Sequence, residues 1–106
     1  MAKGMKELTD TNFDQEIAKG VVLVDFFASW CGPCRMLTPV LEQVAEELQG
    51  QAIVGKVDID SQDKTSSRFQ ISSVPTLILF KDGKEVGRLV GIQTADALKK
   101  WIASAK

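Results

Sequence analysis

The chain has 106 residues and a net charge of −1, with 44% hydrophobic and 25% charged side chains. These values are typical of one globular domain, expected over residues 1–106, whose core needs no disulfide staples. They exclude a strongly basic surface for nucleic acid or an anionic membrane. Residues 1–7 lack the apolar core of a signal peptide, and no apolar run is long enough to span a bilayer. We therefore expect a cytoplasmic protein, most simply a monomer.

The N-terminal part of the chain predicts a strand, a helix and a second strand. Residues 5–8 are expected to form a short edge strand. A helix should start near Thr11, which has capping-box spacing to Asp14, and should end at Gly20. Residues 21–27 are apolar, β-branched and aromatic, a composition that is typical of a buried strand.

A long amphipathic helix is predicted next, ending at Gly50. Pro39 should kink this helix, because proline cannot donate to the carbonyl four residues back. The apolar residues recur at helical spacing and should face the core: Leu37, Val40, Leu41, Val44, Ala45 and Leu48.

Two further strands and a short helix are expected in the middle of the chain. Residues 52–59 alternate loosely between apolar and polar side chains and predict a core strand. A short helix is expected within residues 61–69, capped by Asp60 or Ser61. Residues 76–80 are apolar and form the next predicted strand.

The C-terminal part predicts a hairpin followed by a helix. Asp82 and Gly83 form a strong turn signal between residues 76–80 and a last strand at 85–90. Gly87 within that strand suggests a β-bulge. Thr94 should cap the final helix, whose inward residues would be Leu98, Trp101, Ile102 and Ala105.

The order of predicted elements is βαβαβαββα, which places the chain in the α/β class. Right-handed crossovers through the helices should make the first three strands parallel. The closing hairpin adds an antiparallel pair, so we expect a mixed central sheet with helices on both faces.

The only two cysteines, Cys31 and Cys34, lie where the strand at 21–27 meets the start of the long helix. A helix N-terminus presents unpaired N–H groups and a positive dipole end, which favour the nucleophilic thiolate. Cys31 should lie at or just before the first turn, in the more exposed position, with Cys34 one turn deeper and near enough to bond to it. Pro33 suits a first turn, and Gly32 lets another backbone approach the sulfur.

Other uses of two cysteines fit the sequence less well. A structural disulfide across so short a loop would remove only about 2 kcal/mol of unfolded-chain entropy. Zinc usually takes four Cys or His ligands, and a cysteine hydrolase needs a His, whereas this chain has no His. A reversible dithiol–disulfide couple, with no metal or bound cofactor, is therefore the favoured interpretation.

Four other residues are candidates for the site. Asp25 lies inside an apolar run, so burial should raise its pKa and let it exchange a proton near neutral pH. It could instead reach solvent at the strand end or cap the next turn. Lys56 could be an electrostatic partner or simply a strand lysine that extends to solvent. Trp30 beside the Gly-Pro turn should be half exposed, and Pro75 precedes a strand, a place that tolerates proline.

Two segments carry a resemblance to a known family. Residues 24–35, read as VDFFASWCGPCR, closely resemble the active-site segment of the thioredoxin family, and residues 74–76, VPT, resemble its second signature. The similarity covers essentially the whole chain, element by element. A bare CxxC would be weak evidence, but WCGPC after an apolar strand together with a separate VPT is specific. Phe27 departs from the tryptophan of many members, and Ser73 from a frequent glycine.

The resemblance implies a thioredoxin-like three-layer sandwich and assigns roles within it. Cys31 would attack, Cys34 would resolve the mixed disulfide, and Asp25 would be the buried carboxylate with Lys56 near it. Pro75 would be a cis-proline that faces the dithiol. The surface that receives substrate would comprise Trp30, Ile59, Val74, Gly91 and Ile92, beside Gly32, Pro33 and Pro75.

The implied activity is protein-disulfide reduction on disulfide-containing client proteins. A separate NADPH-dependent flavoprotein, a thioredoxin reductase, would then re-reduce the couple. An oxidase or isomerase is the nearest alternative, but such proteins often carry a His beside the resolving cysteine, and Pro33 offers no such charge. A binding module that docks partners around Trp30 without redox turnover is a second alternative, and its activity would survive replacement of both cysteines by serine.

Overall fold

The computed structural model describes residues 3–106, and this part of the chain forms five strands and four helices in the predicted order. None of these helices is long and apolar enough to cross a membrane. The elements are β1 (Lys6–Glu7), α1 (Phe13–Ile17), β2 (Val21–Phe27), α2 (Gly32–Glu47), β3 (Ile53–Asp58), α3 (Asp63–Arg68), β4 (Thr76–Lys81), β5 (Lys84–Val90) and α4 (Ala95–Ser104).

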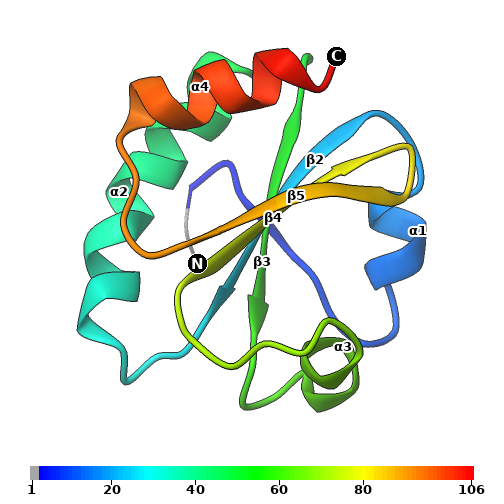
Figure 1. Ribbon diagram of the computed structural model, residues 1–106, viewed down its shortest axis with the longest axis vertical. Coiled ribbons are helices and arrows are strands. Elements are labelled where there is room, and N and C mark those ends of the chain that lie inside the picture. The colour runs from blue at the N-terminus through cyan, green and yellow to red at the C-terminus, as the bar shows by residue number, and fades with distance from the viewer. Residues whose placement is uncertain (1–2) are drawn as a thin grey trace.

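The five strands form one mixed sheet in the order β1-β3-β2-β4-β5 (Figure 1). The first three strands are parallel, with β3 between β1 and β2, as the crossover rule predicts. The hairpin partner β4 runs antiparallel to β2 and β5 antiparallel to β4. The predicted α/β class and mixed sheet are therefore confirmed.

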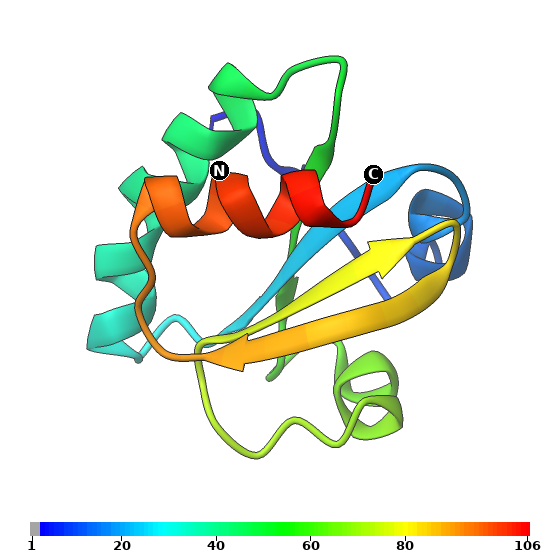
Figure 2. The same cartoon turned by 45° about the horizontal axis from the view of Figure 1, so that its top comes forward.

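Helices cover both faces of the sheet, giving the expected three layers (Figures 1 and 2). Side chains alternate along β2, so Leu23 packs against α2 and α4, while its neighbour Val24 packs on the face of α1. On the α2 side the helices contribute Leu37, Leu41, Val44, Leu98 and Ile102, and on the other side four phenylalanines gather: Phe13, Phe26, Phe69 and Phe80.

The hairpin between β4 and β5 has the predicted turn and bulge. Asp82 and Gly83 both adopt positive φ, 49° and 85°, which a two-residue turn of this twist requires. The register shifts by one residue beside Gly87. The indole of Trp101 fills the space above Gly87, and a Cβ there would lie 3.3 Å from Trp101 Cζ2.

Two helix starts differ from prediction, and α1 is the first. Thr11 does not cap this helix. Instead, Thr9 and Asn12 exchange hydrogen bonds: the Asn12 N–H donates to Thr9 Oγ1 (3.1 Å) and the Thr9 N–H donates to Asn12 Oδ1 (2.7 Å). The reciprocal pattern of a capping box is therefore present two residues earlier than expected. Helix α1 also ends at Ile17, before the left-handed Gly20.

The start of α3 is the second correction, because neither Asp60 nor Ser61 caps it. Asp10, from the loop before α1, accepts the N–H groups of Thr65 (2.8 Å) and Lys64 (3.3 Å) and the hydroxyl of Thr65 (2.6 Å). A residue far away in the sequence thus satisfies helix N–H groups that a local cap would otherwise satisfy. By contrast, Thr94 caps α4 as predicted, and Pro39 lies inside α2, where a kink stays a prediction.

We predict that Asp10→Ala lowers the urea midpoint of unfolding, because N–H groups of Lys64 and Thr65 lose their acceptor. Hydrogen bonds, chiefly from the Thr65 hydroxyl, lower the pKa of Asp10. Its stabilising contribution should therefore be full above the unfolded value of about 3.9 and disappear as pH falls through the lower folded value. Ser61→Ala is the matched control and should stay close to wild type. A Ser61→Ala midpoint as low as that of Asp10→Ala would contradict the assignment.

Candidate active site

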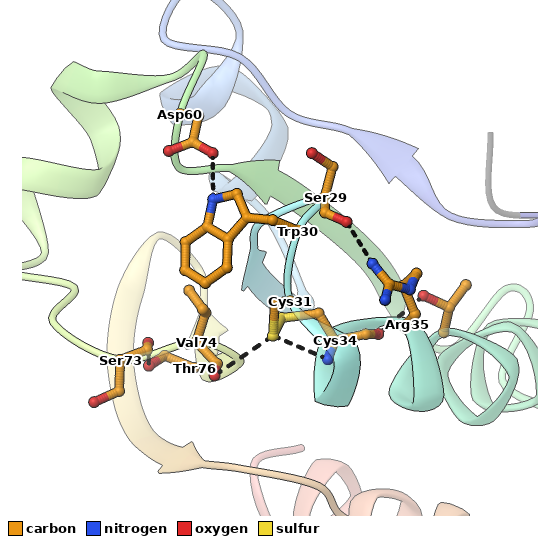
Figure 3. Close-up of a disulfide and its surroundings, with 10 residues drawn as sticks. Ser29, Trp30, Cys31, Cys34, Arg35, Asp60, Ser73, Val74 and Thr76 are labelled. Carbon is orange, nitrogen blue, oxygen red and sulfur yellow. Dashed lines mark hydrogen bonds between the residues drawn. A yellow bond between two sulfur atoms is a disulfide. The ribbon is translucent and has the colours of Figure 1, made fainter.

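The cysteine pair lies at the junction of β2 and α2 (Figure 3). After β2 ends, the Cys31 N–H donates to the carbonyl of Ala28 (3.1 Å), which closes a tight turn. Cys31 has extended backbone angles and is the N-cap of α2, and its carbonyl accepts the Arg35 N–H (3.2 Å). A tight turn directly after the almost entirely buried strand β2 therefore fixes the start of the helix.

Cys31 and Cys34 form a disulfide, with their Cα atoms 5.3 Å apart. The N–H of Cys34 donates to Cys31 Sγ (3.1 Å), so the sulfur takes the position of a capping side-chain oxygen. Both cysteines are buried, with exposed fractions of 5% for Cys31 and 2% for Cys34. Cys31 is thus only slightly the more exposed, and a partner must approach closely to reach it.

An apolar surface surrounds the disulfide. Cys31 and Cys34 pack with Ala28, Ile59 and Val74. Cys31 Sγ lies 3.8 Å from the carbonyl oxygen of Val74, which places the backbone of the loop before β4 directly beside the sulfur (Figure 3).

The loop before β4 is tied down at several points. The Val74–Pro75 peptide bond is cis. The Thr76 hydroxyl donates to the Ser73 carbonyl (2.6 Å), and the Gly91 N–H donates to the Pro75 carbonyl (2.9 Å). Residues 73–76 and Gly91, distant in sequence, are therefore held together near the disulfide.

Trp30 lies beside Cys31 with 66% of its surface exposed, as its position by the Gly-Pro turn predicts. Its indole N–H donates to Asp60 Oδ2 (2.9 Å), and the Asp60 N–H donates to Asp58 Oδ1 (3.0 Å). From the sequence, Asp60 is expected only as a possible helix cap. Its contact with Trp30 joins residues 30 positions apart in the sequence and has no local signal.

Arg35 makes a second contact that the sequence did not indicate. Its guanidinium donates to the Ser29 carbonyl (2.8 Å) across the turn that leads into Cys31 (Figure 3). Together with the Trp30–Asp60 bond, this contact fixes both sides of the segment that carries the nucleophile candidate.

Asp25 is buried in the sheet, with 3% of its surface exposed, and its Oδ1 has no hydrogen-bond partner among the described residues. Burial raises its pKa to about 7, and the positive charge of Lys56 opposes this rise. Asp25 follows Leu23 on the face of β2 that α2 covers. The alternatives of a solvent-exposed or capping aspartate are therefore wrong, and the expectation of a raised pKa agrees with this burial.

Lys56 is the neighbour of Asp25 in the parallel register of β2 and β3. It is half-buried, and its ammonium lies over the ring of Phe27, 5.4 Å from the ring centroid. Its charge thus acts on Asp25 while its ammonium lies over the ring of Phe27.

The remaining candidates differ in exposure: Pro33 and Ile92 are exposed, Pro75 is buried, and the others are half-buried, namely Gly32, Ile59, Val74 and Gly91. Gly32 and Pro33 form the first turn of α2, and Pro33 is exposed. Ile92, 49% exposed, follows Gly91 in the loop between β5 and α4. Within residues 3–106, no group of three or more His, Cys, Asp or Glu side chains could hold a metal ion.

Comparisons with known proteins agree with this geometry. The family model described as Thioredoxin matches residues 4–104. The chain is 53% identical over 98 residues to a thioredoxin of Chlamydia pneumoniae, an alignment that covers 92% of this chain and 95% of that protein. It is 56% identical over 96 residues to a thioredoxin of Chlamydia trachomatis serovar D, covering 91% and 93%.

A third relative comes from a different bacterial genus. A thioredoxin of Staphylococcus haemolyticus is 49% identical over 92 residues, covering 87% of this chain and 88% of that protein. The Cys31–Cys34 disulfide lies at a helix N-terminus, which favours a thiolate once the disulfide is reduced. Thiol–disulfide exchange proceeds by attack of such a thiolate. The chain therefore belongs to the thioredoxin family of thiol–disulfide oxidoreductases.

Proposed function

We propose that this thiol–disulfide oxidoreductase works as a protein-disulfide reductase. Membership of the family implies disulfide substrates and a reductase partner. The observation that carries the proposal is the position of Cys31 as N-cap of α2, where Cys31 Sγ accepts the N–H of Cys34. This position favours a thiolate on Cys31 when the couple is reduced, because the N–H groups and dipole of the helix stabilise negative charge.

In the first step, the Cys31 thiolate attacks one sulfur of a disulfide in a client protein. A bond forms between Cys31 and that sulfur, the client disulfide breaks, and the departing client thiolate takes a proton from solvent. The docking surface consists of exposed or half-buried residues around Cys31, with the buried Pro75 beneath them: Trp30, Gly32, Pro33, Ile59, Val74, Gly91 and Ile92.

In the second step, Cys34 releases the client. Asp25 accepts the proton of the Cys34 thiol, directly or through water, since its raised pKa of about 7 suits proton exchange near neutral pH. The Cys34 thiolate then attacks Cys31, the Cys31–Cys34 disulfide forms, and the second client thiolate leaves. Two electrons have passed from the dithiol to the client. Lys56 tunes this step through its charge on Asp25.

The reducing direction is favoured over oxidation or isomerisation by the residues between the cysteines. The chain has no histidine, so no imidazolium can stabilise the Cys31 thiolate and make the disulfide more oxidising. We propose a cytoplasmic monomer, a single domain over residues 1–106, recycled by an NADPH-dependent flavoprotein thioredoxin reductase. Replacement of both cysteines by serine separates this function from binding alone, which would survive the change.

We predict that the wild-type chain, mixed with a bacterial thioredoxin reductase and NADPH, supports reduction of insulin disulfides, measured by NADPH consumption and by precipitation of the insulin chains. Cys31→Ser should abolish turnover because the first bond cannot form. Cys34→Ser should be able to form the mixed disulfide but not release it, and should therefore accumulate a covalent adduct. Insulin reduction at the wild-type rate by either variant would refute the proposed mechanism.

We predict that Asp25→Asn stabilises the oxidised protein by about 1–4 kcal/mol above pH 7, because it removes a buried charge. The folded pKa of about 7 lies above the unfolded value of about 3.9, so the wild type loses stability as pH rises between these values. The gain of the variant should grow over the same range and then level off. Urea unfolding from pH 4 to 9 measures it.

The same variant should slow release of the mixed disulfide more than its formation, because Cys34 loses its proton acceptor. Asp63→Asn removes an exposed carboxylate and is the matched control, with no comparable dependence on pH. A less stable Asp25→Asn protein with unchanged release would mean that Asp25 is only structural.

A further inference from the structure

The outward surface of α2 next to the disulfide is apolar and exposed. Gly32, Met36 and Pro39 are spaced at i, i+4 and i+7, so they share one face of the helix, opposite the buried Cys34 and Leu37. Met36 is 67% exposed, and Pro33 and Pro39 are also exposed. We call Gly32, Pro33, Met36 and Pro39 the α2 strip.

The charge pattern along α2 separates this strip from an ordinary solvated helix face. Between Gly32 and Leu41 the only charged residue is Arg35, whose guanidinium donates to the Ser29 carbonyl (2.8 Å). The second half of the helix is polar and acidic, with Glu42, Gln43, Glu46 and Glu47. A single exposed methionine is common on protein surfaces, but here apolar exposure is concentrated in the turns nearest the disulfide.

The strip is continuous with the surface that a client must cover. The loop with Val74 lies on one side of the Cys31 sulfur, and α2 leads away on the other (Figure 3). Because Cys31 is only 5% exposed, a client that bonds to its sulfur must contact both the Val74 loop and the first turns of α2.

Chain dimensions bring a client within reach of Met36. A mixed disulfide holds the two Cα atoms about 5–6 Å apart. Met36 lies five residues beyond Cys31, which is about 7.5 Å along the helix axis. Five residues also turn the helix by about 500°, so Met36 points about 140° away from Cys31 around the axis. Its side chain leans toward the N-terminus of the helix, over Gly32 and Pro33, which follow Cys31 directly. A client chain that crosses Gly32 and Pro33 therefore reaches Met36 with a side chain several residues from the attacked cysteine.

We propose that the α2 strip is a second docking surface for protein clients, with Met36 as the residue that selects apolar client side chains close in sequence to the attacked cysteine. The inference rests on the proposed function as a protein-disulfide reductase. The flexible and polarisable thioether suits a contact that must adapt to many client sequences. Met36 is a specificity residue and takes no part in the exchange of bonds.

The test compares a protein disulfide with a small one. The chain is reduced with dithiothreitol, freed of reagent and mixed with increasing insulin or with 5,5′-dithiobis(2-nitrobenzoate), so that no reductase takes part. Met36→Ser should raise the insulin concentration for half-maximal rate about three- to tenfold, as expected for loss of one apolar interface contact. Its maximal rate and its rate with the small disulfide should stay within about twofold of wild type, because the reacting groups are unchanged.

Two variants serve as controls. Met36→Leu keeps an apolar side chain of similar volume and should behave as wild type. Val86→Ser removes another exposed apolar side chain, on β5, and should have no effect. An unchanged half-saturating insulin concentration in Met36→Ser, an equal loss toward the small disulfide, or an equal effect of Val86→Ser would overturn the inference alone. A wild-type chain unable to reduce insulin would overturn the proposed function and the inference with it.

Discussion

The structure depends on the junction that delivers Cys31 from the end of β2 to the start of α2. The strand is buried along nearly its whole length and pairs with β3 on one side and β4 on the other, so its end has little freedom to move. The turn closed by Ala28 then places Cys31 as the helix cap, where its sulfur accepts the N–H of Cys34. This hydrogen bond links the fold to the chemistry. Cys31 Sγ caps the helix, and the helix N–H group stabilises negative charge on the same sulfur.

The buried Asp25 lowers the stability of the fold near the cysteine pair. Asp25 Oδ1 beneath α2 has no hydrogen-bond partner within residues 3–106, which lowers the stability of the core, and burial raises the pKa of the group to about 7. A leucine would fit this position in a sheet better. Natural proteins retain such local conflicts mainly at functional sites, which is why the proposed proton transfer to Asp25 accounts for its presence. Lys56, packed on Phe27, reduces the conflict without removing it.

Features with a local signal could be predicted from the sequence. The periodicity of α2, the Asp82-Gly83 turn, the bulge at Gly87 and the Thr94 cap each depend on residues close together in the chain. The bonds from Asp10 to α3 and from Trp30 to Asp60 could not, because each joins segments 30 or more residues apart. Polar side chains such as Asp60 have several possible local partners, and only the folded chain decides among them. The exposure of Met36 could not be predicted either, because helical spacing alone does not show whether another segment covers a side chain.

The central claim is that the N-terminus of α2 makes Cys31 the nucleophile, and its most direct test is pH-dependent alkylation of the reduced protein with iodoacetamide, with the labelled cysteine identified by peptide mass mapping. The account predicts that Cys31 is labelled well before Cys34 at neutral pH. The labelling rate of Cys31 should reach half its maximum below about pH 8.5, which is the pKa of a free cysteine. Equal labelling of the two cysteines, or faster labelling of Cys34, would contradict it.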